Sequence, residues 1–174
     1  MPYVLADGEG EVIRWFGDTI TVKSAGPKLD VSLITAVAGS ELPLHVHAEA
    51  DEALFVLEGS LTVFAGSERL AASVGAFVFL PAQVPHTFAV ESGSARLLAI
   101  SVPSSSLAMY SEIEERFGAR EMPARPRETD LAVVTPALEE HGVTVIEPPG
   151  TGAKQAPDGR RPGGSRGSTR PTTR

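Results

Sequence analysis

Short apolar segments between Ile13 and Val102 most constrain the fold of this chain. They are TITVKSAG, LDVSLITAVAG, EALFVLEGSLTVFAG, GAFVFLP, HTFAVESG and ARLLAISV. Val, Ile, Leu, Phe and Thr dominate them, and these residue types favour strands. Gly, Ser, Pro and Asp separate them at short intervals, and none has the period of an amphipathic helix. The stretch therefore predicts an all-β architecture, a sandwich or a barrel of antiparallel strands.

Two glycine-centred turns mark places where we expect the chain to reverse. Glu58-Gly59-Ser60 separates ALFVL from LTVF, and Ser92-Gly93-Ser94 separates HTFAV from ARLLAISV. Loops this short commonly join neighbouring antiparallel strands. We therefore predict a tight hairpin at each of the two positions.

The pattern changes after Pro103, where an apolar stripe at helical spacing replaces the strands. The segment SSSLAMYSEIEERFGAR begins with three serines, at 104–106, that can cap a helix, and Gly118 provides a stop. The stripe consists of Leu107, Tyr110, Ile113 and Phe117. A second short amphipathic segment is expected around Leu131 to His141. Both helices are expected to pack on the barrel.

A C-terminal tail differs from the rest of the chain in composition. From Thr151 onward there are six basic residues and one acidic residue, so the tail carries about +5 and the rest about −12 of the net −7. The tail has almost no apolar residue, so it cannot bury enough surface to offset the entropy of ordering. We therefore predict four parts. They are an N-terminal segment (1–12), a β-barrel (13–103), a short helical extension (104–150) and a disordered basic tail (151–174).

Composition limits the class of protein further. Of the 174 residues, 42% are hydrophobic and 21% charged, an ordinary globular balance that fits one domain. The absence of cysteine excludes disulfides, thiolate metal sites and a cysteine nucleophile. No run approaches the roughly 18 apolar residues of a membrane span, and the start MPYVLADGEGEVIRW lacks a signal-peptide pattern. The net charge argues against nucleic acid as a partner. We expect a cytoplasmic protein.

HVHAEADE, at residues 45–52, is the candidate functional stretch. Side chains alternate along a strand, so His45 and His47 project from one side and can approach the same ion. Glu52 shares a face with Leu54 and Val56, and burying its carboxylate on an apolar face requires a partner such as a cation. A third histidine, His86, lies a full hairpin away in FLPAQVPHTFAV. It can join a site only if the fold brings these strands together.

These residues carry a resemblance to the cupin superfamily. The spacing Gly39-x5-His45-x-His47-x4-Glu52-x6-Gly59 matches its first motif. The second stretch, Gly75-x5-Pro81-x-Gln83-x2-His86-x3-Val90, matches the second motif in its Gly, Pro and His. It departs from that motif at Gln83, where Gly is usual, and at Val90, where Asn is usual. The resemblance implies a small jelly-roll β-barrel with a metal in its mouth, held by His45, His47, Glu52 and His86.

The implied ligand set restricts the metal. Three imidazoles and one carboxylate without sulfur suit one divalent first-row ion, namely Fe, Mn, Ni, Co or Cu. Zinc fits less well, because structural zinc sites are usually rich in sulfur and closed. Four protein ligands on an octahedral ion leave two positions for substrate, or for substrate and O2.

The finer resemblance is to the quercetinase-like branch of small cupins. It rests on Trp15 followed by a Gly and a Thr/Val/Lys strand, on PLHVHAEADEALFVLEG and LPAQVPHTFAV, and on the late HGVTVIEPPG. The resemblance implies cleavage of a flavonol-like or other enolic or phenolic molecule by O2. Glu52 would then be catalytic, as a base toward the substrate hydroxyl as well as a metal ligand.

Apolar barrel faces favour a hydrophobic or aromatic ligand over a sugar. Most of the phenylalanines on these strands belong to the core by default. The candidates for substrate contact are Phe55, Phe64, Phe77 and Phe88.

Two other functions stay open at this point, because the cupin fold alone does not imply a reaction. One is a non-catalytic cupin that binds or senses a small molecule, and the other is a metal-dependent isomerase or cyclase. A homodimer is expected by resemblance, and edge strands of a small barrel need covering.

Overall fold

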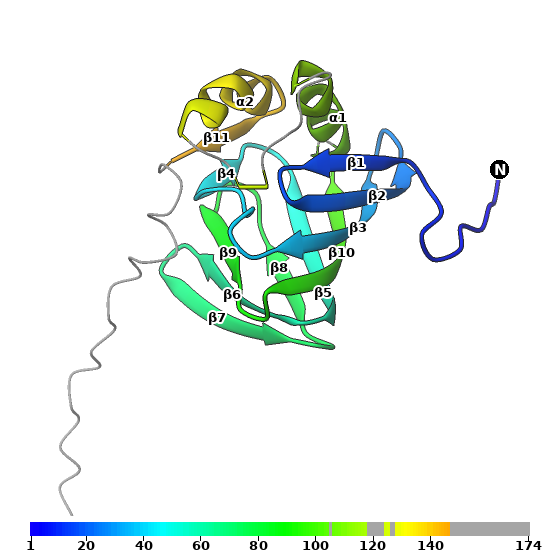
Figure 1. The fold of residues 1–174 in the computed structure, drawn as a ribbon, viewed down its shortest axis with the longest axis horizontal. Coiled ribbons are helices and arrows are strands. Elements are labelled where there is room, and N and C mark those ends of the chain that lie inside the picture. Colours follow the sequence, from blue (N-terminus) through cyan, green and yellow to red (C-terminus); the bar gives the residue numbers. More distant parts are fainter. Residues whose placement is uncertain (105, 118–123, 126–127, 147–174) are drawn as a thin grey trace, which may run out of the picture.

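The computed structural model describes residues 1–104, 106–117, 124–125 and 128–146. Two antiparallel sheets face one another, and two helices lie at one end of them (Figure 1). The first sheet has the strand order β1-β2-β3-β10-β5-β8, and the second has the order β11-β4-β9-β6-β7. This architecture confirms the predicted all-β fold with short C-terminal helices. The predicted tail at 151–174 and the helix stop at Gly118 lie outside the described residues.

The strand and helix bounds follow the apolar runs of the sequence. The first sheet consists of β1 (Val12–Trp15), β2 (Asp18–Ala25), β3 (Asp30–Val37), β5 (Asp51–Glu58), β8 (Phe77–Leu80) and β10 (Ser94–Val102). The second sheet consists of β4 (His45–His47), β6 (Ser60–Ala65), β7 (Glu68–Ser73), β9 (His86–Val90) and β11 (Val143–Val145). The helices are α1 (Ser106–Phe117) and α2 (Glu128–Glu140).

The two predicted hairpins are wrong. β5 pairs with β8 and β10, whereas β6 pairs with β7 and β9, so the turn at Gly59 carries the chain from one sheet to the other. The turn at Gly93 does the same between β9 and β10. Gly59 has a φ of 79°, and a Cβ there would lie 2.5 Å from the Ser94 carbonyl oxygen. A short glycine turn thus serves a change of sheet here, which is how a jelly roll is connected.

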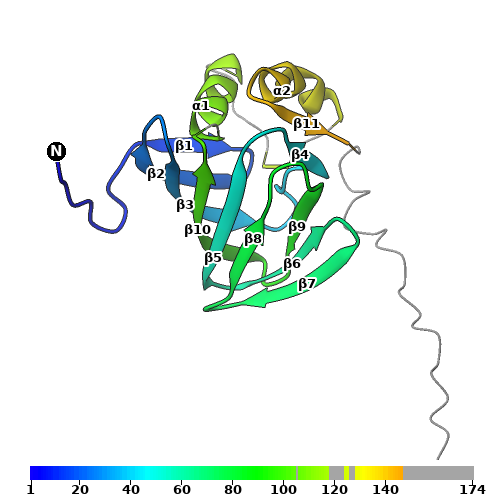
Figure 2. The same ribbon diagram turned by 180° about the vertical axis from the view of Figure 1, so that it is seen from behind.

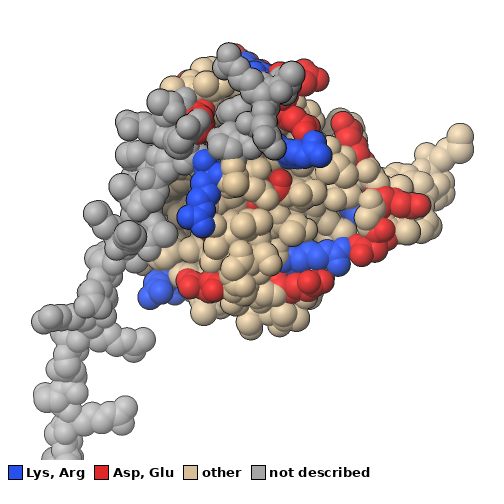
Figure 3. Space-filling view, viewed as in Figure 1, with Lys and Arg blue, Asp and Glu red and all other residues tan. Residues whose placement is uncertain are grey.

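The core fills the space between the sheets. Alternate residues of the strands point inward, including Leu54 and Val56 of β5 and Leu97 of β10, each at most 1% exposed. α1 and α2 close one end of the barrel with Met109, Ile113, Val134 and Leu138 (Figure 2). Among the described residues, no helix is long and apolar enough to cross a membrane. Acidic and basic side chains are interspersed on the face seen in Figure 3.

A buried carboxylate ties the β1–β2 turn to the loop before β4. The Asp18 Oδ1 accepts hydrogen bonds from the Val37 N–H at 2.7 Å and from the Ser40 hydroxyl. The Trp15 indole N–H donates to the Ser40 carbonyl at 3.2 Å. Burial raises the pKa of Asp18 to about 6, although both of its hydrogen bonds act in the opposite direction.

The titration of Asp18 should lower the free energy of unfolding as pH rises from about 4 to 6. Because its folded pKa of about 6 exceeds the unfolded value of 3.8, the folded state binds the extra proton within this window. A difference of about 2 units corresponds to about 3 kcal/mol. The difference in unfolding free energy between wild type and Asp18→Asn, which cancels the titration of the histidines, should shift by this amount against the wild type as pH rises, as measured by urea unfolding of the metal-free proteins between pH 4 and 7. An unchanged pH profile in the variant would contradict the assignment.

Candidate metal centre

Three strands deliver the predicted ligands to one point. His45 and His47 lie on the same side of β4, and His86 begins β9, where its Cα pairs with that of His45. Glu52 belongs to β5 in the opposite sheet. One ligand atom from each of the four residues lies within 4.8 Å of all the others. The fold therefore closes the cluster across the interior of the barrel.

Two of the histidines are held in a fixed orientation by backbone carbonyls. The His45 Nδ1 lies 2.8 Å from the Pro43 carbonyl oxygen, and the His86 Nδ1 lies 2.8 Å from that of Val84. A carbonyl can only accept, so each Nδ1 carries the hydrogen. The lone pair is then on Nε2, which is the arrangement that metal-binding histidines adopt.

Burial and the Glu52 carboxylate set the charges of the cluster. Burial lowers the pKa of His45 to about 3, and it also lowers the pKa of His47. Burial alone would lower the pKa of His86, but Glu52, with an Oε2 3.4 Å from the His86 Nε2, outweighs it and raises this pKa. The histidines in turn hold the pKa of Glu52 below its usual value, although burial acts to raise it. Glu52 is therefore ionised at neutral pH.

One buried atom of the cluster lacks a hydrogen-bond partner. The His86 Nε2 is inaccessible to solvent and makes no hydrogen bond, although Glu52 lies at ion-pair distance. Buried polar atoms without a partner are rare and costly. A divalent cation that accepts this lone pair, together with those of the other two imidazoles and the carboxylate, would satisfy the site. The residues present thus fit a metal ion.

The four phenylalanines predicted to contact the substrate lie on different faces of their strands. Phe88 lies two residues after His86 on the same face of β9 and packs against the core. Phe64 is buried on β6, where Thr87 is its Cα partner, so it lies on the face opposite to His86. Phe55 and Phe77 are Cα partners of each other and are exposed on the outer face of the first sheet. Of the four, only Phe88 shares a face with a ligand.

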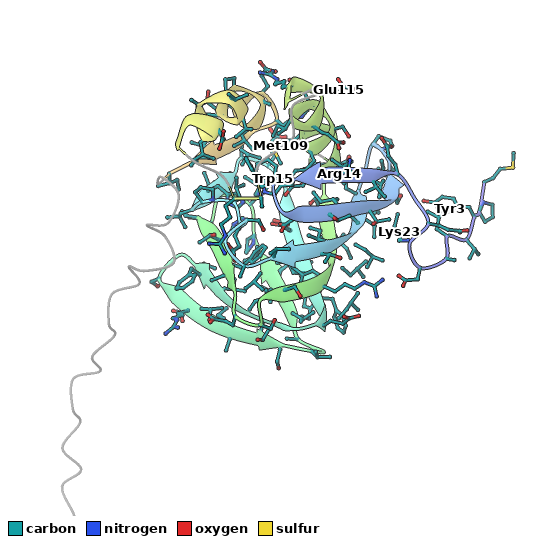
Figure 4. The ribbon with its side chains drawn as sticks, viewed as in Figure 1. Tyr3, Arg14, Trp15, Lys23, Met109 and Glu115 are labelled. Carbon is teal, nitrogen blue, oxygen red and sulfur yellow. The ribbon has the colours of Figure 1, made fainter. Side chains whose placement is uncertain are left out.

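Tyr110 is a candidate site residue that the sequence indicated only as part of a helical stripe. Its ring lies 5.4 Å from that of Trp15, and Figure 4 shows Trp15 next to α1 at the end of the barrel. Burial raises the pKa of Tyr110, and the charges of Glu52 and Asp18 raise it further. The phenol is therefore protonated and lies within electrostatic range of Glu52. A tyrosine in an apolar stripe was the only sequence signal for it.

The strand β11 was also missed, within a segment predicted as helical. It pairs with β4 along its whole length, with Val143 opposite His47 and Val145 opposite His45. Two further hydrogen bonds extend the ladder, from the Ala48 N–H to the Gly142 carbonyl and from the Ile146 N–H to the Leu44 carbonyl, each 2.8 Å. The run of β-branched residues after Gly142 is the sequence signal for this strand.

Gln83 stands where the cupin motif usually has Gly, and its backbone adopts the conformation that Gly favours. Its φ is 65°, in the left-handed region, so a small strain is stored there. The Gln83 N–H donates to the His47 carbonyl at 2.8 Å. The turn therefore fixes the backbone of a ligand residue despite the substitution.

A cavity of about 360 Å³ borders the cluster at His47. It lies between the β4–β5 connection, the start of α1 and the end of α2. Its lining includes Ala50, Pro103, Ser104, Ala108 and His141. The volume is within the range of small-molecule pockets.

Comparison with known proteins agrees with this geometry. Residues 32–102 match the family model described as a cupin domain. Quercetin 2,3-dioxygenase of Bacillus subtilis is 31% identical over 127 residues, which cover 71% of this chain. The matched stretch spans only 38% of that relative's length.

Solved structures share the fold at low sequence identity. KdgF from Halomonas sp. superposes with a TM-score of 0.57 at 16% identity, over 62% of this chain and 99% of its own. An RmlC-like cupin from Shewanella frigidimarina gives 0.56 at 17% identity, over 62% and 96%. Pac13, described as a nucleoside dehydratase, gives 0.50 at 17% identity, over 59% and 83%. Residues 32–102 therefore match a cupin domain, the chain resembles a quercetin 2,3-dioxygenase, and the solved structures share its fold.

Proposed function

We propose that this cupin holds one divalent first-row transition metal ion and cleaves an enolic or phenolic small molecule with O2. The observation that carries the proposal is the convergence of three imidazoles and one carboxylate, with the buried His86 Nε2 left unpartnered. The likeness to a quercetin 2,3-dioxygenase supports the choice of reaction. When bound, the ion would supply Lewis acidity and, in the redox-active cases, access to O2 chemistry.

Glu52 is the proposed base of the reaction. Its carboxylate is ionised, because the surrounding histidines hold its pKa low. Its side chain is 18% exposed, compared with 3% for that of His86, so it is the more accessible partner of the pair. A hydroxyl proton of the substrate could thus pass to a Glu52 oxygen.

The surroundings of Glu52 favour a planar apolar ligand. Leu80 and Ser101 are its Cα partners on the neighbouring strands, and both are nearly fully buried. Phe88 lies on the same face of β9 as His86, and the protonated Tyr110 phenol lies within electrostatic range of Glu52. We propose that Phe88 and Tyr110 contact the substrate, in place of the outward-facing Phe55 and Phe77.

Oxygen uptake by the metal-reconstituted protein tests the proposal. The metal-free protein is loaded separately with Fe, Mn, Ni, Co or Cu, and each form is mixed with quercetin and simpler enols in an oxygen electrode. We expect uptake that requires both metal and substrate, and none from the zinc-loaded control. Tight metal retention without uptake in any combination would reject the dioxygenase and favour a binding cupin. Substrate conversion without uptake would favour an isomerase.

A further inference from the structure

The cavity beside His47 contains a histidine that the proposed reaction does not use. This histidine, His141, follows the last residue of α2 and lines the cavity together with Ala48, Ala50 and Ala108. The helices α1 and α2 lie side by side at this end of the barrel (Figure 1). Both helices and the β4–β5 connection therefore contribute walls to the cavity.

The backbone fixes the position of His141 relative to β4. Gly142 follows it with a φ of 73°, a conformation that commonly ends a helix. The Gly142 carbonyl accepts a hydrogen bond from the Ala48 N–H at 2.8 Å, and the pairing of β11 with β4 begins at Val143. His141 is thus one residue away from a backbone contact with the strand that carries two of the clustered histidines.

A carboxylate of α1 orients the His141 ring. The His141 Nε2 lies 2.9 Å from the Glu112 Oε2, and the Glu112 Oε1 accepts a hydrogen bond from the Arg116 Nε at 2.9 Å. Hydrogen bonds from Arg116 and His141 hold the pKa of Glu112 below its usual value, so this carboxylate is ionised and can only accept. The His141 Nε2 therefore carries a hydrogen, and in the neutral ring the lone pair is on Nδ1.

The His141 Nδ1 is the unused polar atom of this pair. Among the described residues no hydrogen bond reaches it, and 24% of the His141 side chain is exposed. Histidines that accept a proton or a hydrogen bond from a ligand commonly have their other nitrogen held by a carboxylate in this way. The ring is therefore arranged to accept a hydrogen bond at Nδ1.

The lining restricts the ligand to a neutral group with an apolar body. Pro103 and the three alanines form apolar walls. The described lining contains the Glu140 carboxylate and neither Lys nor Arg, and the Arg116 guanidinium is already paired with Glu112 and Glu140. An anion would therefore find no free cation in the described lining. The cavity of about 360 Å³ is larger than the roughly 150 Å³ of a cavity that binds benzene.

We propose that this cavity binds a phenol group, whose hydroxyl donates to the His141 Nδ1 and whose ring lies against the apolar walls. The pair formed by His141 and Glu112 supplies the acceptor, and the charge of the lining selects the neutral phenol over a carboxylate. The phenol is either an arm of a substrate held at the metal or a separate molecule, since His47 belongs to the cluster and also borders the cavity.

Phenol, toluene and benzoate test the site, because they share a ring and differ in the group that would meet His141. Each is titrated into the full chain at pH 8, with and without zinc, and the imidazole signals are followed by NMR. We expect phenol to bind with a dissociation constant in roughly the millimolar range, and benzoate to bind more weakly. Phenol should also shift the imidazole signal that is missing from His141→Leu.

The ratio of phenol affinity to toluene affinity separates the hydrogen bond from the fit of the ring. In His141→Leu this ratio should fall by about 3- to 10-fold, which is the effect of one hydrogen bond. Glu112→Gln removes the charge that orients the ring and should lower the ratio in the same direction. Glu115→Gln makes the same change at an exposed residue of α1, labelled in Figure 4, and should keep the wild-type ratio.

Three results would overturn the inference. They are a wild-type ratio in His141→Leu, an equal loss of phenol and toluene binding in that variant, which would indicate a structural role, and phenol binding that requires zinc, which would place the phenol at the metal. Quercetin added to the zinc-loaded protein identifies the source of the phenol. Displacement of bound phenol assigns the cavity to an arm of the substrate, and joint binding assigns it to a separate molecule. None of these measurements depends on oxygen uptake, so the site can stand even if the proposed reaction fails.

Discussion

His86→Ala is expected to reduce metal affinity by more than about 100-fold. Loss of an outer partner of a metal ligand already lowers metal affinity by about 10- to 100-fold. His86 is itself one of the four clustered residues that we propose as ligands. Its buried Nε2 also makes no hydrogen bond, with only the Glu52 carboxylate at ion-pair distance. The affinity is measured by competition with a chelator of known strength, followed by metal analysis after gel filtration.

Thermal unfolding provides a second measurement of the loss of metal binding in His86→Ala. A ligand at 100 times its dissociation constant stabilises the folded state by about 2.7 kcal/mol. Wild-type protein should show this gain on metal addition, and His86→Ala should lose most of it. The fourth histidine of the chain provides the control. His141 interacts with Glu112 at 2.9 Å outside the cluster, so His141→Ala should keep the full gain. Equal affinity in wild type and His86→Ala would contradict the site.

Glu52→Gln is expected to lower turnover far more than metal binding. The amide keeps the shape of the side chain and an oxygen that can coordinate, but it cannot accept a proton as a carboxylate does. Loss of a general base typically costs about 10²- to 10⁴-fold. We therefore expect the rate per bound metal to fall within that range, while metal affinity falls by less than about 100-fold.

The exposed neighbour of the ligands gives the matched control. Glu49→Gln removes the same charge from the β4–β5 connection without touching the cluster, so both its rate and its affinity should be close to those of wild type. Rates are compared per bound metal, by oxygen uptake on the best substrate of the screen. If Glu52→Gln matches wild type on that scale, Glu52 is a ligand and not a base.

The ligand cluster could be predicted because its determinants are local and periodic. Alternation along β4 places His45 and His47 on one face, and the same rule places Glu52 with Leu54. The distant partner His86 could not be assigned from periodicity, and it was predicted from the resemblance of Gly75, Pro81 and His86 to the second cupin motif. Gly59 and Gly75 do adopt positive φ, at 79° and 86°, so the glycines of the motifs serve the turns that bring the ligands together.

Features that depend on strand pairing could not be read in the same way. The sequence of a short glycine turn is the same whether the turn joins two strands of one sheet or leads from one sheet to the other. The prediction of hairpins at Gly59 and Gly93 was therefore wrong. Alternation alone places Phe55 opposite to Glu52 and Phe88 with His86, but it does not say which way Phe64 and Phe77 face. The register shows that Phe55 lies on the outside of β5 and Phe88 beside His86.

The pairing of β11 with β4 has a consequence for how the protein matures during synthesis. β4 carries two ligands but shares only one register pair with β9, so its main backbone partner is β11, about a hundred residues later in the chain. While a ribosome is still translating residues 143–145, His45 and His47 sit on a strand with one free edge. Metal loading should therefore be a late event, and a nascent chain stalled before Val143 should capture the ion poorly even when the rest of the barrel has formed.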